Sequence, residues 1–203
     1  MTRLNLAHMS RPIILASASP RRQDLLKRLV DDFEIVPSDA DEEITEALPA
    51  NEVAERNARA KARDVARRLS SGTIIAADTV VAAADGGIVG KPSNRTEAKA
   101  ILARLSGSRH RVITGVCLLD VRTGEVDCRS ACTWVTMRKM SKKEIAEYVA
   151  SGEADGKAGA YAIQETADRF VKMVEGSISN VVGLPLELLE EMLKETKKGS
   201  GLQ

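Results

Sequence analysis

Aromatic side chains are scarce in this chain of 203 residues, which has two phenylalanines, two tyrosines and one tryptophan. So few rings exclude a protein that stacks successive nucleobases, as RNA-binding and single-strand-binding modules do. An excess of charge is also lacking, because 30 basic and 29 acidic side chains leave a formal net charge of +1. This balance argues against binding of nucleic acid through a large basic surface.

Signals for membranes, secretion and disulfides are missing as well. No apolar run approaches the ~20 residues of a transmembrane helix, and the first ten residues lack an apolar core of signal-peptide length. The three cysteines, Cys117, Cys128 and Cys132, are odd in number and clustered. No disulfide framework is therefore expected. These absences together predict a cytoplasmic protein with no membrane partner.

Apolar residues are plentiful, at 43% of the chain, and their spacing alternates between the strand and helix periods. Residues 12–16, 73–82, 112–121 and 130–137 are predicted strands, and residues 51–69 and 96–105 are predicted helices. This order is typical of an α/β fold with a mixed central sheet flanked by helices. We expect a polar N-terminal extension (1–12), a single domain (13–193) and a polar, frayed tail (194–203).

Ser17, Arg21 and Arg22 surround a predicted junction between a strand and a helix. Within it, Ser19 suits the N-cap and Pro20 suits the first helical position. Free backbone N–H groups at a helix start attract anions, and guanidinium groups suit phosphate. The junction is either a phosphate site or an ordinary helix start with solvated arginines, and the local sequence leaves both open.

Asp78 is an acid inside the apolar run Ile74–Val81. Burying a carboxylate costs free energy unless it is paired, hydrogen-bonded or bound to a metal. We expect a functional acid near the end of this strand, with a structural acid that caps a backbone N–H as the alternative. In a regular strand, Thr79 points to the opposite face.

Three weaker signals lie on either side of that strand. Glu42 belongs to an acidic loop of the kind that suits Mg²⁺ beside a bound phosphate, and Lys61 lies on a predicted helix. Gly87–Pro92 looks like a P-loop but lacks its first glycine and the hydroxyl residue after the lysine. Lys91 can still contact a phosphate as a point charge. Each of these residues could equally be solvated surface.

The segment Asp155–Gln164 is rich in small residues. Such a segment lets the backbone approach a ligand or another part of the chain closely. Its last residue, Gln164, carries both a donor and an acceptor, which suits the edge of a nucleobase. A glycine-rich turn before a strand is the alternative.

Together these segments resemble the Maf family of nucleoside triphosphate pyrophosphatases. They occur in the family's order and cover about residues 13–193. The matching blocks are Leu15–Arg22, Ala76–Val81, Gly90–Pro92, Leu105–Gly107 with Thr114–Val116, Lys157–Tyr161 with Ile163–Gln164, and Gly176–Ser177 with Asn180–Pro185.

The resemblance implies an elongated, two-lobed α/β domain with an active-site cleft, as in Maf and ITPase-like proteins. It implies hydrolysis of a nucleoside triphosphate to the monophosphate and pyrophosphate with a divalent cation (Mg²⁺, Mn²⁺ or Co²⁺). Asp78 matches the catalytic base, and Glu42 a second acid that shares the metal with it. The other roles fall on residues for phosphate binding (Ser17, Arg21, Arg22, Lys61, Lys91) and for base choice (Arg21, Thr79, Gln164).

The pairs Asp78–Thr79 and Ile163–Gln164 resemble the branch of the family that acts on dTTP and UTP. This implies a house-cleaning role in the nucleotide pool, with a nucleotide as partner and a homodimer as a family expectation. Two alternatives remain: a nucleotide-binding regulator of cell division without catalysis, and an inosine or xanthosine triphosphate pyrophosphatase of related fold. Gly156 departs from the family pattern by adding a residue to its loop.

Overall fold

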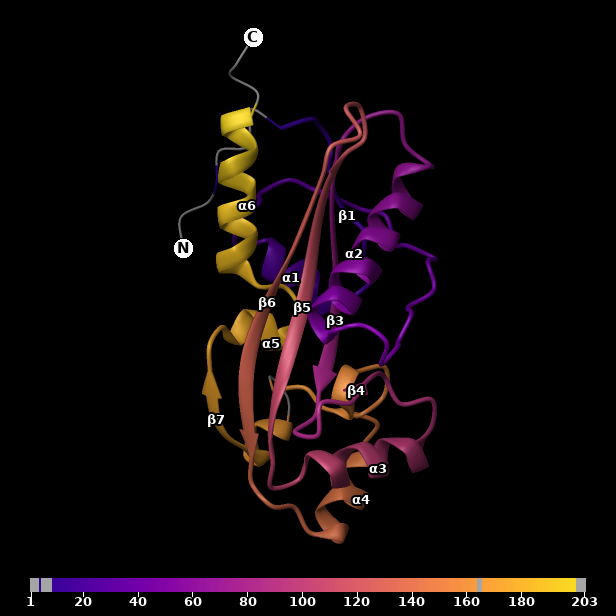
Figure 1. Cartoon of the computed structure of the whole chain (residues 1–203), viewed down its shortest axis with the longest axis vertical. Helices are drawn as coiled ribbons and strands as arrows, with labels where there is room; N and C mark the ends of the chain where they lie inside the picture. The colour runs from indigo at the N-terminus through magenta and orange to yellow at the C-terminus, as the bar shows by residue number, and fades with distance from the viewer. Residues whose placement is uncertain (1–3, 5–8, 164–165, 200–203) are drawn as a thin grey trace.

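A long mixed β-sheet forms the spine of the molecule in a computed structural model, which describes residue 4, residues 9–163 and residues 166–199 (Figure 1). Within these residues, strands pair in the order β2-β1-β3-β5-β6-β7, and β4 pairs with β3. Strand β1 is parallel to both of its neighbours, whereas the other pairs are antiparallel. The strands are β1 (Ile13–Leu15), β2 (Glu34–Ile35), β3 (Thr73–Ala82), β4 (Ile88–Val89), β5 (Arg109–Asp120), β6 (Val126–Met137) and β7 (Val171–Glu175).

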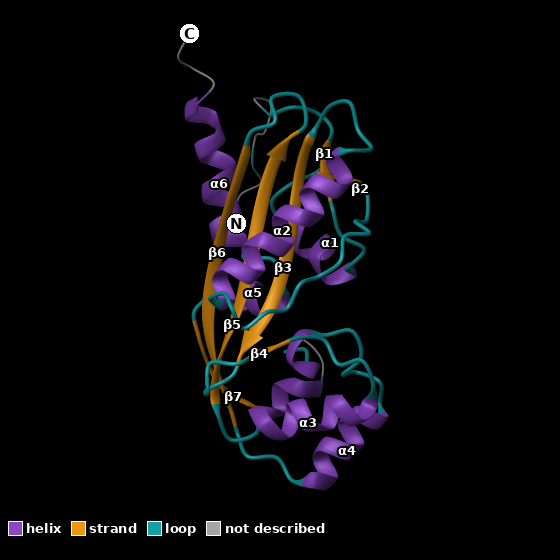
Figure 2. Ribbon diagram, turned by 45° about the vertical axis from the view of Figure 1, so that its right-hand side comes forward, coloured by secondary structure: helices purple, strands orange, loops and turns teal. Residues whose placement is uncertain are grey.

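Helices cover both faces of the sheet at one end of the molecule (Figures 1 and 2). Ile75 and Ala77 of β3 pack with helices α1 and α6, and the alternate residues Ile74 and Ala76 pack with α2. This two-residue period explains why the β3 sequence is apolar almost throughout, as predicted for a central strand. The α-helices are α1 (Pro20–Leu26), α2 (Ala50–Ala66), α3 (Arg95–Leu105), α4 (Lys142–Ala150), α5 (Ile178–Val182) and α6 (Leu186–Gly199).

A second apolar cluster forms the other end of the molecule, where α3 and α4 pack beyond β3 (Figure 2). Tyr148 of α4 and Phe170 meet edge to face there, with their ring centroids 5.6 Å apart. A capping box starts α4: Ser141 accepts from the backbone of Glu144, and the Glu144 carboxylate accepts in return. Apolar packing on both faces of the sheet at one end and this cluster at the other end give the two lobes.

Gly115 lets helix α2 lie unusually close to the sheet. A Cβ atom at this position would overlap the backbone of Ala54 on α2 and would lie 2.5 Å from the backbone nitrogen of Glu55. Gly115 of β5 is also the register partner of Asp78 on β3. The missing side chain therefore brings α2 down onto the sheet at the level of the buried acid.

The predicted fold class is confirmed, and two local predictions are wrong. Asp78 lies in the middle of β3 rather than near its end, because β3 continues to Ala82. No disulfide framework was expected, but Cys117 and Cys128 form a disulfide because they face each other across β5 and β6. Helix α6 continues to Gly199, and the proposed division into extension, domain and tail stays a prediction.

Several elements have no counterpart among the predicted ones. The Gly-rich segment leads into a short 3₁₀ turn (Ala158–Ala160) rather than a strand, and β7 and α5 follow it unpredicted. Each described helix is too short or too polar to traverse a bilayer.

Candidate active site

Two acids from separate segments share one ammonium group. Asp78 on β3 is buried, and its Oδ1 lies 2.6 Å from Nζ of Lys61 on α2. The same Nζ lies 2.7 Å from Oε1 of Glu42, in the loop after β2. Burying a carboxylate costs free energy unless it has such a partner. The structure therefore brings together three residues that the sequence marked only singly.

Lys91 adds a second cation to this cluster. Its Nζ lies 2.5 Å and 2.6 Å from the two carboxylate oxygens of Glu42. Pairing of β4 with β3 turns the chain back and delivers Lys91 to this place. Partial burial opposes ionisation of Glu42, but the ammonium groups of Lys61 and Lys91 outweigh it and hold its pKa at about 2. Glu42 is therefore a carboxylate at neutral pH.

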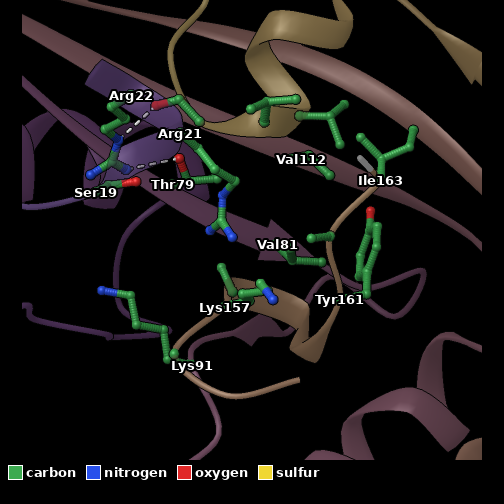
Figure 3. Close-up of a pocket in the computed structure, with 16 residues that line it drawn as sticks. Ser19, Arg21, Arg22, Thr79, Val81, Lys91, Val112, Lys157, Tyr161 and Ile163 are labelled. Atoms are coloured by element: carbon green, nitrogen blue, oxygen red, sulfur yellow. Dashed lines mark hydrogen bonds between the residues drawn. The ribbon is translucent and has the colours of Figure 1, made fainter. Parts of the chain in front are cut away.

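A cleft that is partly open to solvent is lined by Lys91 of this cluster, and Figure 3 shows the cleft. Three cationic side chains, Arg21, Lys91 and Lys157, lie on one side of it. Its other side is lined by less polar side chains, Val112, Tyr161 and Ile163. Lys91 belongs both to the cleft and to the acid cluster, so the two features form one site.

Arg22 uses its guanidinium to tie three segments together, in contacts drawn in part in Figure 3. It donates to the carbonyl of Gly183 (2.8 Å), to Oγ1 of Thr79 (3.2 Å) and to Oγ of Ser17 (3.4 Å). Burial lowers the pKa of Arg22, although the charges of Asp78 and Glu42 oppose this. Arg22 thus connects the start of α1 with β3 and the end of α5.

The start of α1 lacks a side-chain cap. Ser19 occupies the N-cap position, but its side chain makes no capping hydrogen bond. Its backbone N–H instead donates to Oγ of Ser17, at 3.2 Å. The hydroxyl of Ser17 therefore serves two protein donors, one from Ser19 and one from Arg22.

Thr79 has its proton committed within the protein. The hydroxyl of Thr114 donates to the carbonyl of Asn180, at 3.0 Å. The 2.9 Å contact between the Thr79 and Thr114 hydroxyls therefore needs Thr79 as the donor. Arg22 donates to the Thr79 oxygen in turn, and Thr79 lines the cleft. Toward a ligand, Thr79 can act only as an acceptor.

The small-residue segment closes one wall of the cleft, as its composition allows. Gly159 has φ +71, and a Cβ there would lie 2.9 Å from Val81 of β3. Its N–H donates to the carbonyl of Gly90, at 3.1 Å, which anchors the segment beside Lys91. Behind this wall, the hydroxyl of Tyr161 lies 2.9 Å from Nε2 of the buried His110.

Of the predicted site residues, Arg21, Arg22, Thr79 and Lys91 line the cleft. Glu42, Lys61 and Asp78 form the acid cluster next to it, and Ser17 contacts Arg22. Gln164 lies outside the described residues, and the role of each residue stays a prediction. Asp78 faces α2 and Thr79 faces Arg22, which agrees with their predicted opposite directions. The sequence analysis did not single out Asn57, and it gave no individual role to Thr114 or Lys157, which lie in the matching blocks. A signal existed for Asn57, because it precedes Lys61 by four residues and so shares its helix face.

Comparison with known proteins links this site to a family. A family model described as "Maf-like protein" matches residues 12–196. A protein of Ruminiclostridium cellulolyticum named dTTP/UTP pyrophosphatase is 46% identical over 187 residues, covering 91% of this chain and 96% of that protein. Proteins with the same name from Syntrophomonas wolfei (45%; 88% and 94% covered) and Methanosarcina barkeri (43%; 91% and 94% covered) are similar to a comparable degree.

Proposed function

The chain belongs to the family of Maf-like proteins, and from this premise we propose that it hydrolyses dTTP and UTP to the nucleoside monophosphate and pyrophosphate. One observation carries the proposal. The acid pair of Asp78 and Glu42 adjoins a cleft with cationic and apolar sides, and Lys91 belongs to both. A hydrolase that acts on a triphosphate needs acids for water and cations for phosphate in one place.

The distribution of charge in the cleft supports a nucleotide in one orientation. The triphosphate carries several negative charges, which the side chains of Arg21, Lys91 and Lys157 offset. The base then lies toward Val112, Tyr161 and Ile163. In the proposed reaction the α-phosphate lies at the side of the cleft nearest the acid cluster, where Lys91 contacts Glu42.

Water is the nucleophile in the proposed reaction. Its oxygen attacks the α-phosphorus, the bond from that phosphorus to the bridging oxygen breaks, and pyrophosphate leaves. Asp78 orients the water and accepts its proton, with Glu42 as the second acid. The ammonium of Lys61 holds both carboxylates, and the cations of the cleft stabilise the negative charge that grows on the leaving oxygens.

The carboxylates of Glu42 and Asp78 fit a divalent cation such as Mg²⁺, Mn²⁺ or Co²⁺. Both are hard oxygen donors that meet at one point, where a cationic group, the ammonium of Lys61, already lies between them. Among the described residues no three or more acids, histidines or cysteines gather into a metal cage. Mg²⁺ is commonly bound by one or two carboxylates together with substrate phosphates. When bound, the cation supplies positive charge to the phosphate oxygens.

Base choice follows from the hydroxyl of Thr79, which can only accept. Thymine and uracil present an N3–H donor, whereas cytosine presents an N3 acceptor. A site built to pair one edge rejects the other, because buried polar groups are then left unpaired. Thr79 therefore favours dTTP and UTP over CTP, with Arg21 and Gln164 proposed as further contacts to the base.

A panel of nucleotides tests the proposed function. Release of pyrophosphate is measured with dTTP, UTP, CTP, ATP, GTP and ITP, each with and without Mg²⁺, and the nucleoside product is identified. We expect the highest kcat/KM for dTTP and UTP, with the monophosphate as product. Equal rates on all six nucleotides, a preference for ITP, or binding without turnover would each contradict the proposal.

A further inference from the structure

Asn57 is a buried amide whose hydrogen bonds all run between two parts of the site. It lies on α2 and is 2% exposed. Its Nδ2 donates to Oδ2 of Asp78 (3.0 Å) and to the carbonyl of Glu43 (2.9 Å). Its Oδ1 accepts from the N–H of Glu43, at 3.0 Å. Both amide hydrogens and the amide oxygen are therefore used.

The contacts of Asn57 complement those of Lys61, one helical turn along α2. Lys61 donates to Oδ1 of Asp78, and Asn57 donates to Oδ2. One face of α2 therefore binds both carboxylate oxygens. Asn57 adds no charge to the cluster. The plane of the Asp78 carboxylate is thus fixed by contacts to both of its oxygens.

The loop that carries Glu42 depends on the same amide. Residues 36–45 form neither helix nor strand, so no backbone ladder fixes Glu42. Asn57 binds both the N–H and the carbonyl of Glu43, as a neighbouring strand would. An apolar side chain at position 57 would leave these groups unpaired and release Oδ2 of Asp78.

We propose that Asn57 is a positioning residue that sets the spacing between Asp78 and Glu42. The inference rests on the proposed function, in which these two acids act together. Asn57 is not among the residues that line the described cleft. Its loss should therefore weaken turnover and cation binding at the acid pair, while leaving the binding of the nucleotide nearly unchanged.

The test uses Asn57→Leu, which has similar size, with Arg56→Ala as the matched control. Arg56 neighbours Asn57 on α2 and contacts the exposed carboxylate of Glu43 at 3.4 Å. Steady-state kinetics with dTTP and binding of Mn²⁺ followed by electron paramagnetic resonance are measured for each protein. Losing a residue that orients a metal ligand costs about 10- to 100-fold in activity or metal affinity.

We expect Asn57→Leu to lower kcat by about 10- to 100-fold, to weaken Mn²⁺ binding by about tenfold or more, and to change KM by less than about threefold. Arg56→Ala should leave all three near the wild-type values. Wild-type kcat with wild-type Mn²⁺ affinity in Asn57→Leu would overturn the inference. A fall in kcat/KM caused by a change in KM alone would also overturn it, because Asn57 would then act on nucleotide binding in the cleft.

Two further outcomes are decided within the same experiment. If Asn57→Leu does not fold, Asn57→Ser is measured against the same expectations, since the smaller side chain also loses the bridge. If the wild type hydrolyses neither dTTP nor UTP, the proposed function fails. The Mn²⁺ affinities then decide the inference alone, and a wild type that binds no more tightly than the variant overturns it.

Discussion

Lys61 holds two carboxylates together, so its removal should destabilise the protein in a way that depends on Asp78. Lys61→Met keeps the length of the side chain but removes the ammonium, which lies 2.6 Å from Asp78 and 2.7 Å from Glu42. Breaking a buried ion pair by removing one partner costs about 3–5 kcal/mol. Two carboxylates ~5 Å apart also repel each other by roughly 3 kcal/mol at an effective dielectric constant of ~20.

The free energy of unfolding is measured from urea titrations followed by circular dichroism, at neutral pH with a chelator present. We expect Lys61→Met to lose about 3–5 kcal/mol, and the double variant Lys61→Met/Asp78→Asn to recover at least about half of it, because the unpaired charge is gone. Returning a divalent cation should stabilise Lys61→Met more than the double variant. A loss below about 1 kcal/mol, as for an exposed pair, or no recovery in the double variant, would refute this reasoning.

Three further predictions concern the surroundings of the site. Gly115→Ala should push α2 away at Ala54, costing about 1–3 kcal/mol of unfolding free energy and lowering kcat on dTTP; unchanged values of both would contradict the close approach. Thr114→Val should free the proton of Thr79, and we expect the UTP:CTP ratio of kcat/KM to fall by about tenfold. His110→Gln should remove a pH dependence of the free energy of unfolding. Burial lowers the pKa of His110 from 6.5 to about 4, so the unfolded state takes up the proton first as pH falls. Between pH 7 and pH 5 the free energy of unfolding should therefore fall by about 2 kcal/mol more in the wild type than in the variant.

The order of strands and helices could be predicted from the sequence because apolar spacing reports which faces are buried. Strand β3 shows this best, since both of its faces are covered and its sequence is apolar on both. The elements β7 and α5 were not predicted, because they are five residues each and half-exposed. Such short segments owe their conformation to the neighbours on which they pack.

The residues of the site could be found singly from the sequence, but not their contacts. Asp78 was evident as an acid in an apolar strand, whereas Glu42 and Lys61 looked like ordinary surface residues. Their pairing depends on how close α2 comes to the sheet, and that distance is set by Gly115 on another strand. Asn57 was missed for the same reason, because its partners are 14 and 21 residues away in the chain.

The central claim is that Asp78 acts on the water that attacks the triphosphate, and Asp78→Asn tests it most directly. The amide keeps the shape of the side chain but cannot accept the proton. Turnover of dTTP is compared with that of the wild type and of Asp85→Asn, a control at an exposed acid whose partner is Arg104. We predict that kcat falls by about 100-fold or more in Asp78→Asn and is unchanged in the control, whereas near wild-type turnover in Asp78→Asn would contradict the claim.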